Sequence, residues 1–213
     1  QSTKFSSLSG SMQFTTKNQF LFLVKNNIYT RFDKIFLTGD WRFQLYSQET
    51  YGLGTMAPEG GILQYQFDLA GRPTSQDSLA QPMSFNFIRL HQSVSFKIKE
   101  SLYMGVSYKL DGYSKIIDHK LGISETDTTL ITSHYGYSSY YGFNPEKYYS
   151  SAIGVNLIYD TRDNMINPYT GMFAMASWRG AMEFLGSDTR GDYYQIEWRS
   201  YHSVSKRNPR HLD

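Results

Sequence analysis

Residues 159–171, YDTRDNMINPYTG, bring together side chains that could do chemistry. Asp160 and Asp163 stand three residues apart, with Arg162 between them. Paired carboxylates can act as general acid and base, but such a pair must flank a substrate cleft at a set separation. A calcium loop needs oxygen ligands at alternate positions and a terminal bidentate acid, and no Glu closes this segment. A structural turn, pinned by a bidentate ion pair from Arg162, is the third alternative.

The residue types favour the structural turn. The side chains of Asp163, Asn164 and Asn167 can hydrogen-bond their own backbone, Pro168 fixes φ, and Gly171 permits positive φ. We therefore interpret this segment as the connection between two strands.

Period-two alternation marks the elements that would hold this turn. In residues 34–46, apolar and polar side chains fall on opposite faces of an extended chain, as they do in 88–98 (with Gln92 the one misfit), 102–111 and 194–199. The sequence has no convincing amphipathic-helix pattern. We predict an all-β chain with strands near 8–15, 19–29, 34–46, 84–98, 102–114, 150–159, 172–183 and 191–204.

The predicted strands favour a transmembrane antiparallel up-and-down β-barrel. Their length of about 9–14 residues suits a tilted strand crossing a bilayer. Short connections at one end alternate with longer ones at the other, as in outer-membrane barrels, and the tight turn at 16–18 on the long-loop side fits this pattern least. A tyrosine-rich soluble barrel is the alternative, and a further strand at 61–69 would change the strand parity. If the chain forms a transmembrane barrel, we expect eight charged side chains to face the lumen: Asp40, Arg42, Arg89, Lys97, Lys109, Asp111, Glu197 and Arg199.

Composition narrows the function classes. The chain has no cysteine, its net charge is +2 with both signs interspersed, and no nucleic-acid footprint appears. No Gly-x-Ser-x-Gly elbow occurs. The histidines show no metal-binding spacing, so we expect no enzyme, no catalytic residue, no cofactor and no metal; they are His91, His119, His134, His202 and His211.

The opening segment also carries a resemblance. YDTRDNMINPYTG, a strand, FLGSD and then DYYQIEWRSYHSV together resemble the barrel of the BamA/TamA superfamily, the bacterial surface-antigen outer-membrane proteins. The resemblance is specific over about 153–204, and YGLG at 51–54 adds to it. The matching residues are Tyr159, Asp160, Arg162, Asp163, Asn164, Asn167, Pro168 and Gly171, then Gly186, Ser187 and Asp188.

The resemblance implies a barrel of roughly sixteen strands, of which about eight are present here. We therefore expect residues 1–213 to be one β-barrel domain, the N-terminal part of a barrel, cut off after SKRNPRHLD. The family's Val-Arg-Gly-Phe/Tyr motif and its periplasmic POTRA domains are absent from the sequence.

The implied location is the bacterial outer membrane. The implied function is assembly, insertion or translocation of outer-membrane or secreted proteins. The expected partners are the lipid bilayer and client outer-membrane proteins or accessory subunits, with no nucleic acid. A passive channel or a surface-binding barrel is the alternative function.

Overall fold

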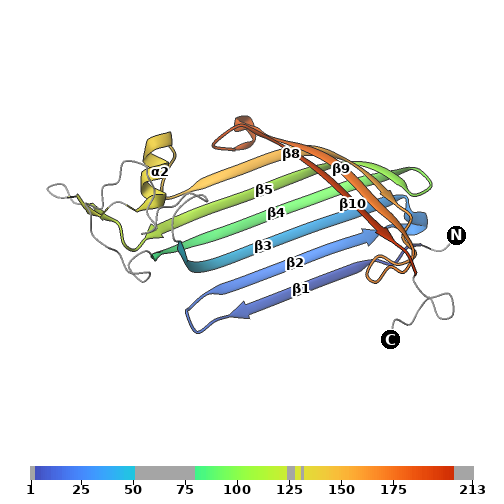
Figure 1. Ribbon diagram of the computed structural model, residues 1–213, viewed down its shortest axis with the longest axis horizontal. Helices are drawn as coiled ribbons and strands as arrows, with labels where there is room; N and C mark the ends of the chain where they lie inside the picture. Colours follow the sequence, from blue (N-terminus) through green and yellow to red (C-terminus); the bar gives the residue numbers. More distant parts are fainter. Residues whose placement is uncertain (1–2, 51–79, 124–127, 131, 204–213) are drawn as a thin grey trace.

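The computed structural model describes residues 3–50, 80–123, 128–130 and 132–203. Eight long strands form one antiparallel sheet in which each strand pairs with the next long strand along the chain (Figure 1). The strands are β1 (Ser7–Phe14), β2 (Phe20–Tyr29), β3 (Ile35–Thr50), β4 (Gln81–Lys99), β5 (Leu102–Asp118), β8 (Tyr148–Asp160), β9 (Gly171–Ala181) and β10 (Gly191–Tyr201). The all-β, up-and-down prediction is confirmed, and so are the eight predicted strands.

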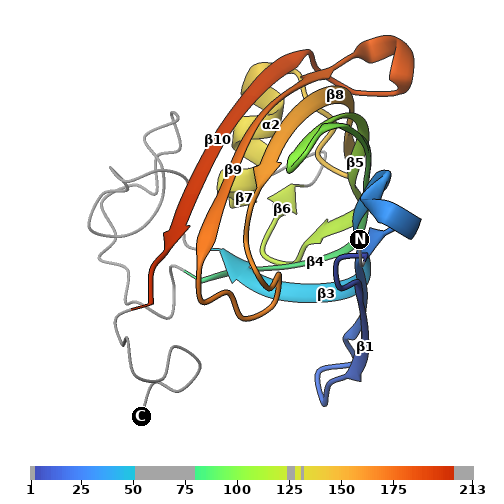
Figure 2. The ribbon, with the colours of Figure 1, turned by 90° about the vertical axis from the view of Figure 1, so that its right-hand side faces the viewer.

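The sheet curls into an open trough rather than a closed barrel. In the described residues β1 and β10 each pair on one side only. Figure 2 shows the trough open between these two edge strands. Closure into a barrel is therefore not observed. The strand predicted at 61–69 and the segments YGLG and SKRNPRHLD lie outside the described residues.

The connections at one end span residues 30–34, 100–101 and 161–170. At the other end 51–80 and 119–147 are long, as predicted, but 15–19 is a tight turn and 182–190 is no longer than 161–170, so the alternation in length holds only in part. A short 3-10 turn, η1 (Arg31–Asp33), lies in the first of these and another, η2 (Glu183–Leu185), precedes β10. The long connection after β5 contains the short strands β6 (Gly122–Ile123) and β7 (Thr128–Leu130), which pair with each other.

The expectation of a chain without helices is wrong for one segment, α2 (Ser133–Tyr141). Its tyrosines do not follow an apolar stripe, so the periodicity test misses it. Two local features support the helix. The rings of Tyr137 and Tyr141, one turn apart, lie 4.6 Å apart, and Gly142 ends the helix in the left-handed conformation with φ 71°. None of the helices in the described part of the chain is long and apolar enough to cross a membrane.

Three central strands run further than predicted, to Thr50 in β3, Gln81 in β4 and Asp118 in β5. Cross-strand aromatic pairs accompany the extensions. The ring of Phe85 lies 6.0 Å from that of Tyr46 and 5.4 Å from that of Tyr113. Such pairs stabilise neighbouring strands beyond the point where simple alternation fades.

The convex face of the trough is mainly apolar, and no described element covers it. Trp41, Phe43 and Leu45 on β3 are 38–41% exposed, although a soluble sandwich would bury such a face. Exposure is higher on the edge strands, where Met12 of β1 is 64% exposed and Ile196 of β10 is 87% exposed. The edge side chains lack a flanking strand on one side, and this explains the difference.

Gln92, the one break in the alternation of β4, sits on this convex face. Its Nε2 donates to the carbonyl of Thr38 on β3 at 3.0 Å. Gly39 makes the space, because a Cβ at that position would overlap Gln92 Oε1 and Asn26 Nδ2. The misfit is therefore a local polar contact between strands, and the register stays intact.

A small core lies on the concave face near the short connections. Tyr29 and Phe36 stack with ring centroids 4.2 Å apart, and the buried side chains of Tyr103 and Ile158 complete the cluster. This core draws on four strands, β2, β3, β5 and β8. It packs at the end of β8, where the turn of residues 161–170 begins.

Candidate functional site

An ion pair opens the turn between β8 and β9. Asp160, the last residue of β8, is almost fully buried. Arg162 donates from Nε to one of its carboxylate oxygens and from Nη2 to the other, both at 2.9 Å. The predicted bidentate pair is therefore confirmed, and Asp160 rather than Asp163 is its partner. The hydrogen bond to Asp160 raises the pKa of the Arg162 guanidinium, so this cation stays protonated.

Two residues remote in sequence complete the environment of Asp160. Lys4 donates from Nζ to the backbone carbonyl of Asp160 at 2.7 Å and lies 3.8 Å from its Oδ2. The hydroxyl of Tyr29 donates to the same oxygen at 3.3 Å. The carboxylate thus ties the segment before β1, the end of β2 and the turn after β8 into one network.

Sequence reasoning missed Lys4 and Tyr29. Lys4 lies 156 residues from Asp160 in the chain, and Tyr29 lies 131 residues from it. No local spacing signals such a contact, because it depends on how eight strands curl.

Asp163 organises the rest of the turn. Its Oδ1 accepts hydrogen bonds from the backbone N–H groups of Asn164, Tyr169 and Thr170 at 2.9–3.2 Å. Desolvation alone would raise the pKa of this carboxyl, but the three N–H donors hold it below the ordinary value. The turn therefore gains stability from the ionised carboxylate. This gain is present above the unfolded-state pKa and is lost as the pH falls through the folded-state pKa.

The remaining motif residues act locally. Asn164 Oδ1 accepts from the backbone N–H groups of Ile166 and Asn167 at 2.8 and 3.2 Å. Asn167 Nδ2 contacts the hydroxyl of Tyr169 at 3.3 Å. Gly171 has φ 105° and begins β9. Tyr159 lies on the convex face and Pro168 lies within the turn, so the motif does not converge on one point.

The two carboxylates do not form an acid–base pair facing a common cleft. Asp160 is held by cations, and Asp163 is occupied by its own turn. In the described ranges no group of three His, Asp or Glu side chains is arranged to hold a metal ion.

Two Ser–His contacts exist elsewhere, between Ser84 and His119 at 2.9 Å and between Ser200 and His202 at 2.6 Å. Neither histidine pairs with a carboxylate among the described residues.

The turn borders a cavity of about 320 Å³ on the concave face. Arg162, Met165 and Ile166 reach it from the turn, and Lys109 and Arg199 reach it from β5 and β10. Hydroxyl and amide side chains form much of the remaining wall, so the space suits water and polar groups.

The charged residues predicted to face a lumen lie on the concave face. Arg42 pairs with Asp40 through two hydrogen bonds of 2.6 and 2.7 Å. Asp111 accepts from Arg89 at 2.6 Å and contacts His91 at 2.9 Å. Three further residues share this face: Lys97 opposite Tyr103, and Glu197 paired with Arg199.

The concave face therefore carries three ion-paired clusters together with Lys97 and Lys109, whereas the convex face is mainly apolar. Compared with known proteins, the chain matches no family model and no curated protein.

Proposed function

We propose that this chain is a membrane-embedded β-sheet protein of the bacterial outer membrane, whose convex face contacts lipid and whose concave face lines a polar lumen. The observation that carries the proposal is the uncovered apolar face, which includes Trp41, Phe43 and Leu45. Exposed apolar areas of this extent mark contact with another apolar phase. Paired charges on the opposite face suit an aqueous interior.

The dimensions agree with a bilayer. From Ile35 to Leu45 every second side chain of β3 is on the convex face, and all but Gly39 are apolar. Ten residue steps at ~3.3 Å, tilted by about 40°, give a band of roughly 25 Å along the membrane normal. An apolar band of outer-membrane barrels has about this height.

Tryptophan quenching by brominated lipids tests the embedding. A variant with Trp178→Phe and Trp198→Phe retains Trp41 as its only tryptophan. After reconstitution of the full chain into liposomes, we expect bromine on the acyl chains to quench Trp41 strongly and aqueous acrylamide to quench it weakly.

The matched control moves the reporter across the sheet. Adding Trp41→Phe and Gln44→Trp places the tryptophan on the concave face, which Gln44 shares with Arg42. Acrylamide should then be the stronger quencher. Equal quenching of both reporters by lipid would rule out the two-faced arrangement.

Within this class, we propose that the chain acts in assembly, insertion or translocation of outer-membrane proteins, as the surface-antigen resemblance implies. Two features support it: the Asp160–Arg162 turn that carries the resemblance, and the two edge strands, which pair on one side only within the described part of the chain. An unpaired backbone group in hydrocarbon costs several kcal/mol, so an edge strand favours pairing with an incoming strand. The mechanism is strand pairing and membrane insertion, with no bond chemistry.

A client-folding assay tests this role. Liposomes containing the full chain should accelerate the folding of an eight-stranded outer-membrane client, followed by its shift to the folded band on a gel, relative to empty liposomes. Liposomes with an unrelated barrel at equal protein density provide the control for membrane disturbance. Folding rates that match this control would remove the assembly role.

The alternative function is a passive channel, favoured by the charged concave face. Planar-bilayer recordings separate the two. Steady ion conductance without acceleration of client folding would support the channel over the assembly role.

A further inference from the structure

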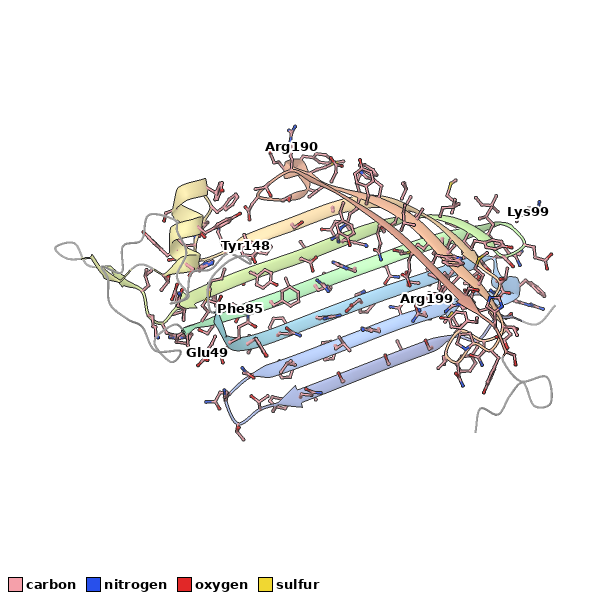
Figure 3. All side chains as sticks on the ribbon, viewed as in Figure 1. Glu49, Phe85, Lys99, Tyr148, Arg190 and Arg199 are labelled. Carbon is pink, nitrogen blue, oxygen red and sulfur yellow. The ribbon has the colours of Figure 1, made fainter. Side chains whose placement is uncertain are left out.

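A second cavity, of about 430 Å³, lies on the concave face at the end of the trough where α2 sits. Aromatic rings from four strands line it: Tyr46, Phe85, Phe87, Tyr113 and Tyr148. Tyr113 contacts Phe87 and Tyr148 with ring centroids 4.8 Å apart in each pair. Figure 3 places Phe85 and Tyr148 at this end of the molecule, away from Arg199.

Planar polar groups stand beside the rings. Gln44 and Gln48 flank Tyr46 along β3, and Arg42 and Arg89 close the deeper side. Each guanidinium is held by a carboxylate on the concave face, which leaves its other N–H groups as oriented donors.

The charges of this cavity are balanced. Asp40 compensates Arg42, and Asp111 compensates Arg89. A phosphate or sulfate ligand would have to compete with these carboxylates. The balance therefore favours a neutral ligand that offers both donors and acceptors.

A buried hydroxyl at the α2 side also lacks a partner. Ser133 is 1% exposed and lines the cavity, and its Oγ makes no hydrogen bond in the described structure. A buried polar atom without a partner costs about 1–3 kcal/mol, so rotation of this hydroxyl toward a ligand hydroxyl in the cavity would be favoured.

We propose that this cavity binds a saccharide. A pyranose ring presents C–H groups that pack against the negative face of an aromatic ring. Its edge presents hydroxyls that pair with side-chain amides, guanidinium groups and a serine hydroxyl. A purely apolar ligand would offer no partner to the remaining N–H groups of Arg42, the amide of Gln44 or the hydroxyl of Ser133. The inference uses the cavity alone and does not depend on the proposed assembly role.

Calorimetric titration of the full chain tests the inference. The protein is kept in lauryldimethylamine-oxide micelles, since sugar-headed detergents would compete, and is titrated with maltohexaose, cellohexaose and chitohexaose. We expect at least one of them to bind. Tyr148→Ala should weaken that binding about tenfold, which corresponds to about 1.4 kcal/mol, because it removes a stacked ring.

Two controls make the result specific. Tyr148→Phe keeps the ring and should bind within about twofold of the parent chain. Tyr193→Ala removes a half-exposed ring of the concave face on β10, away from the cavity lining, and should leave the affinity unchanged.

The inference is overturned if none of the three hexasaccharides binds at about 10 mM, or if Tyr148→Ala and Tyr193→Ala act alike. The lipid-quenching and client-folding results are separate readouts, so failure here leaves the proposed function standing.

Discussion

Replacing Asp160 with alanine is expected to lower the free energy of unfolding by about 3–5 kcal/mol, because it leaves a largely buried guanidinium without its counter-charge. The Arg162 side chain is only 9% exposed and also packs over the ring of Phe173, 4.6 Å from its centroid. The hydroxyl of Tyr29 loses its acceptor, and Lys4 loses the carboxylate 3.8 Å from its Nζ but keeps its hydrogen bond to the backbone carbonyl. Unfolding by guanidinium chloride in micelles, followed by tryptophan fluorescence, measures the loss of unfolding free energy.

An exposed ion pair supplies the matched control. Arg190 and Glu183 are 3.2 Å apart, with side chains 80% and 59% exposed. Glu183→Ala should change the stability by no more than about 1 kcal/mol. If the two variants cost the same, the Asp160 network does not stabilise the fold beyond an ordinary surface pair.

A double variant separates charge from packing. Asp160→Leu with Arg162→Met removes both charges while keeping much of the volume, and replacement of a whole buried pair by apolar groups is often close to neutral. We therefore expect the double variant to be more stable than Asp160→Ala alone. If the double variant loses as much free energy of unfolding as the Asp160→Leu and Arg162→Met single variants do in sum, the two charges act independently.

The strands could be predicted from the sequence because a sheet with one apolar and one polar face requires apolar and polar residues to alternate along each strand. In β3 the alternation that begins at Ile35 is the same alternation that exposes Trp41 and pairs Asp40 with Arg42. A bidentate pair from Arg162 was also predictable, since Asp160 and Asp163 both lie within two residues of it, but the choice of Asp160 was not.

The contacts between distant residues could not be predicted, because they depend on how the sheet curls. Lys4 reaches Asp160 only because β1 and β8 line the same concave space. The aromatic cavity combines residues from four strands that are far apart in the chain, so no stretch of sequence contains it. Helix α2 was missed because Tyr, Ser and Gly give no apolar stripe, although Gly142 marked its end.

Gly171→Ala is the second substitution with a large expected effect. The residue has φ 105°, which side-chain-bearing residues rarely adopt, and an added Cβ would overlap the carbonyl oxygen of Thr161. Backbone strain and overpacking together should cost about 2–6 kcal/mol in the free energy of unfolding. The same guanidinium titration measures it.

Substitutions at Gly186 and Gly191 separate the cost of backbone strain from the cost of steric overlap. Gly186 has φ 88° but open space around its Cβ position, so Gly186→Ala carries backbone strain alone and should cost about 1–2 kcal/mol. Gly191 begins β10 without positive φ and also has open space, so Gly191→Ala should be close to neutral. The expected order of destabilisation is Gly171, then Gly186, then Gly191. Equal losses of unfolding free energy for Gly171→Ala and Gly186→Ala would contradict this order. They would mean that the backbone moves away from Thr161 and relieves the overlap with the added Cβ.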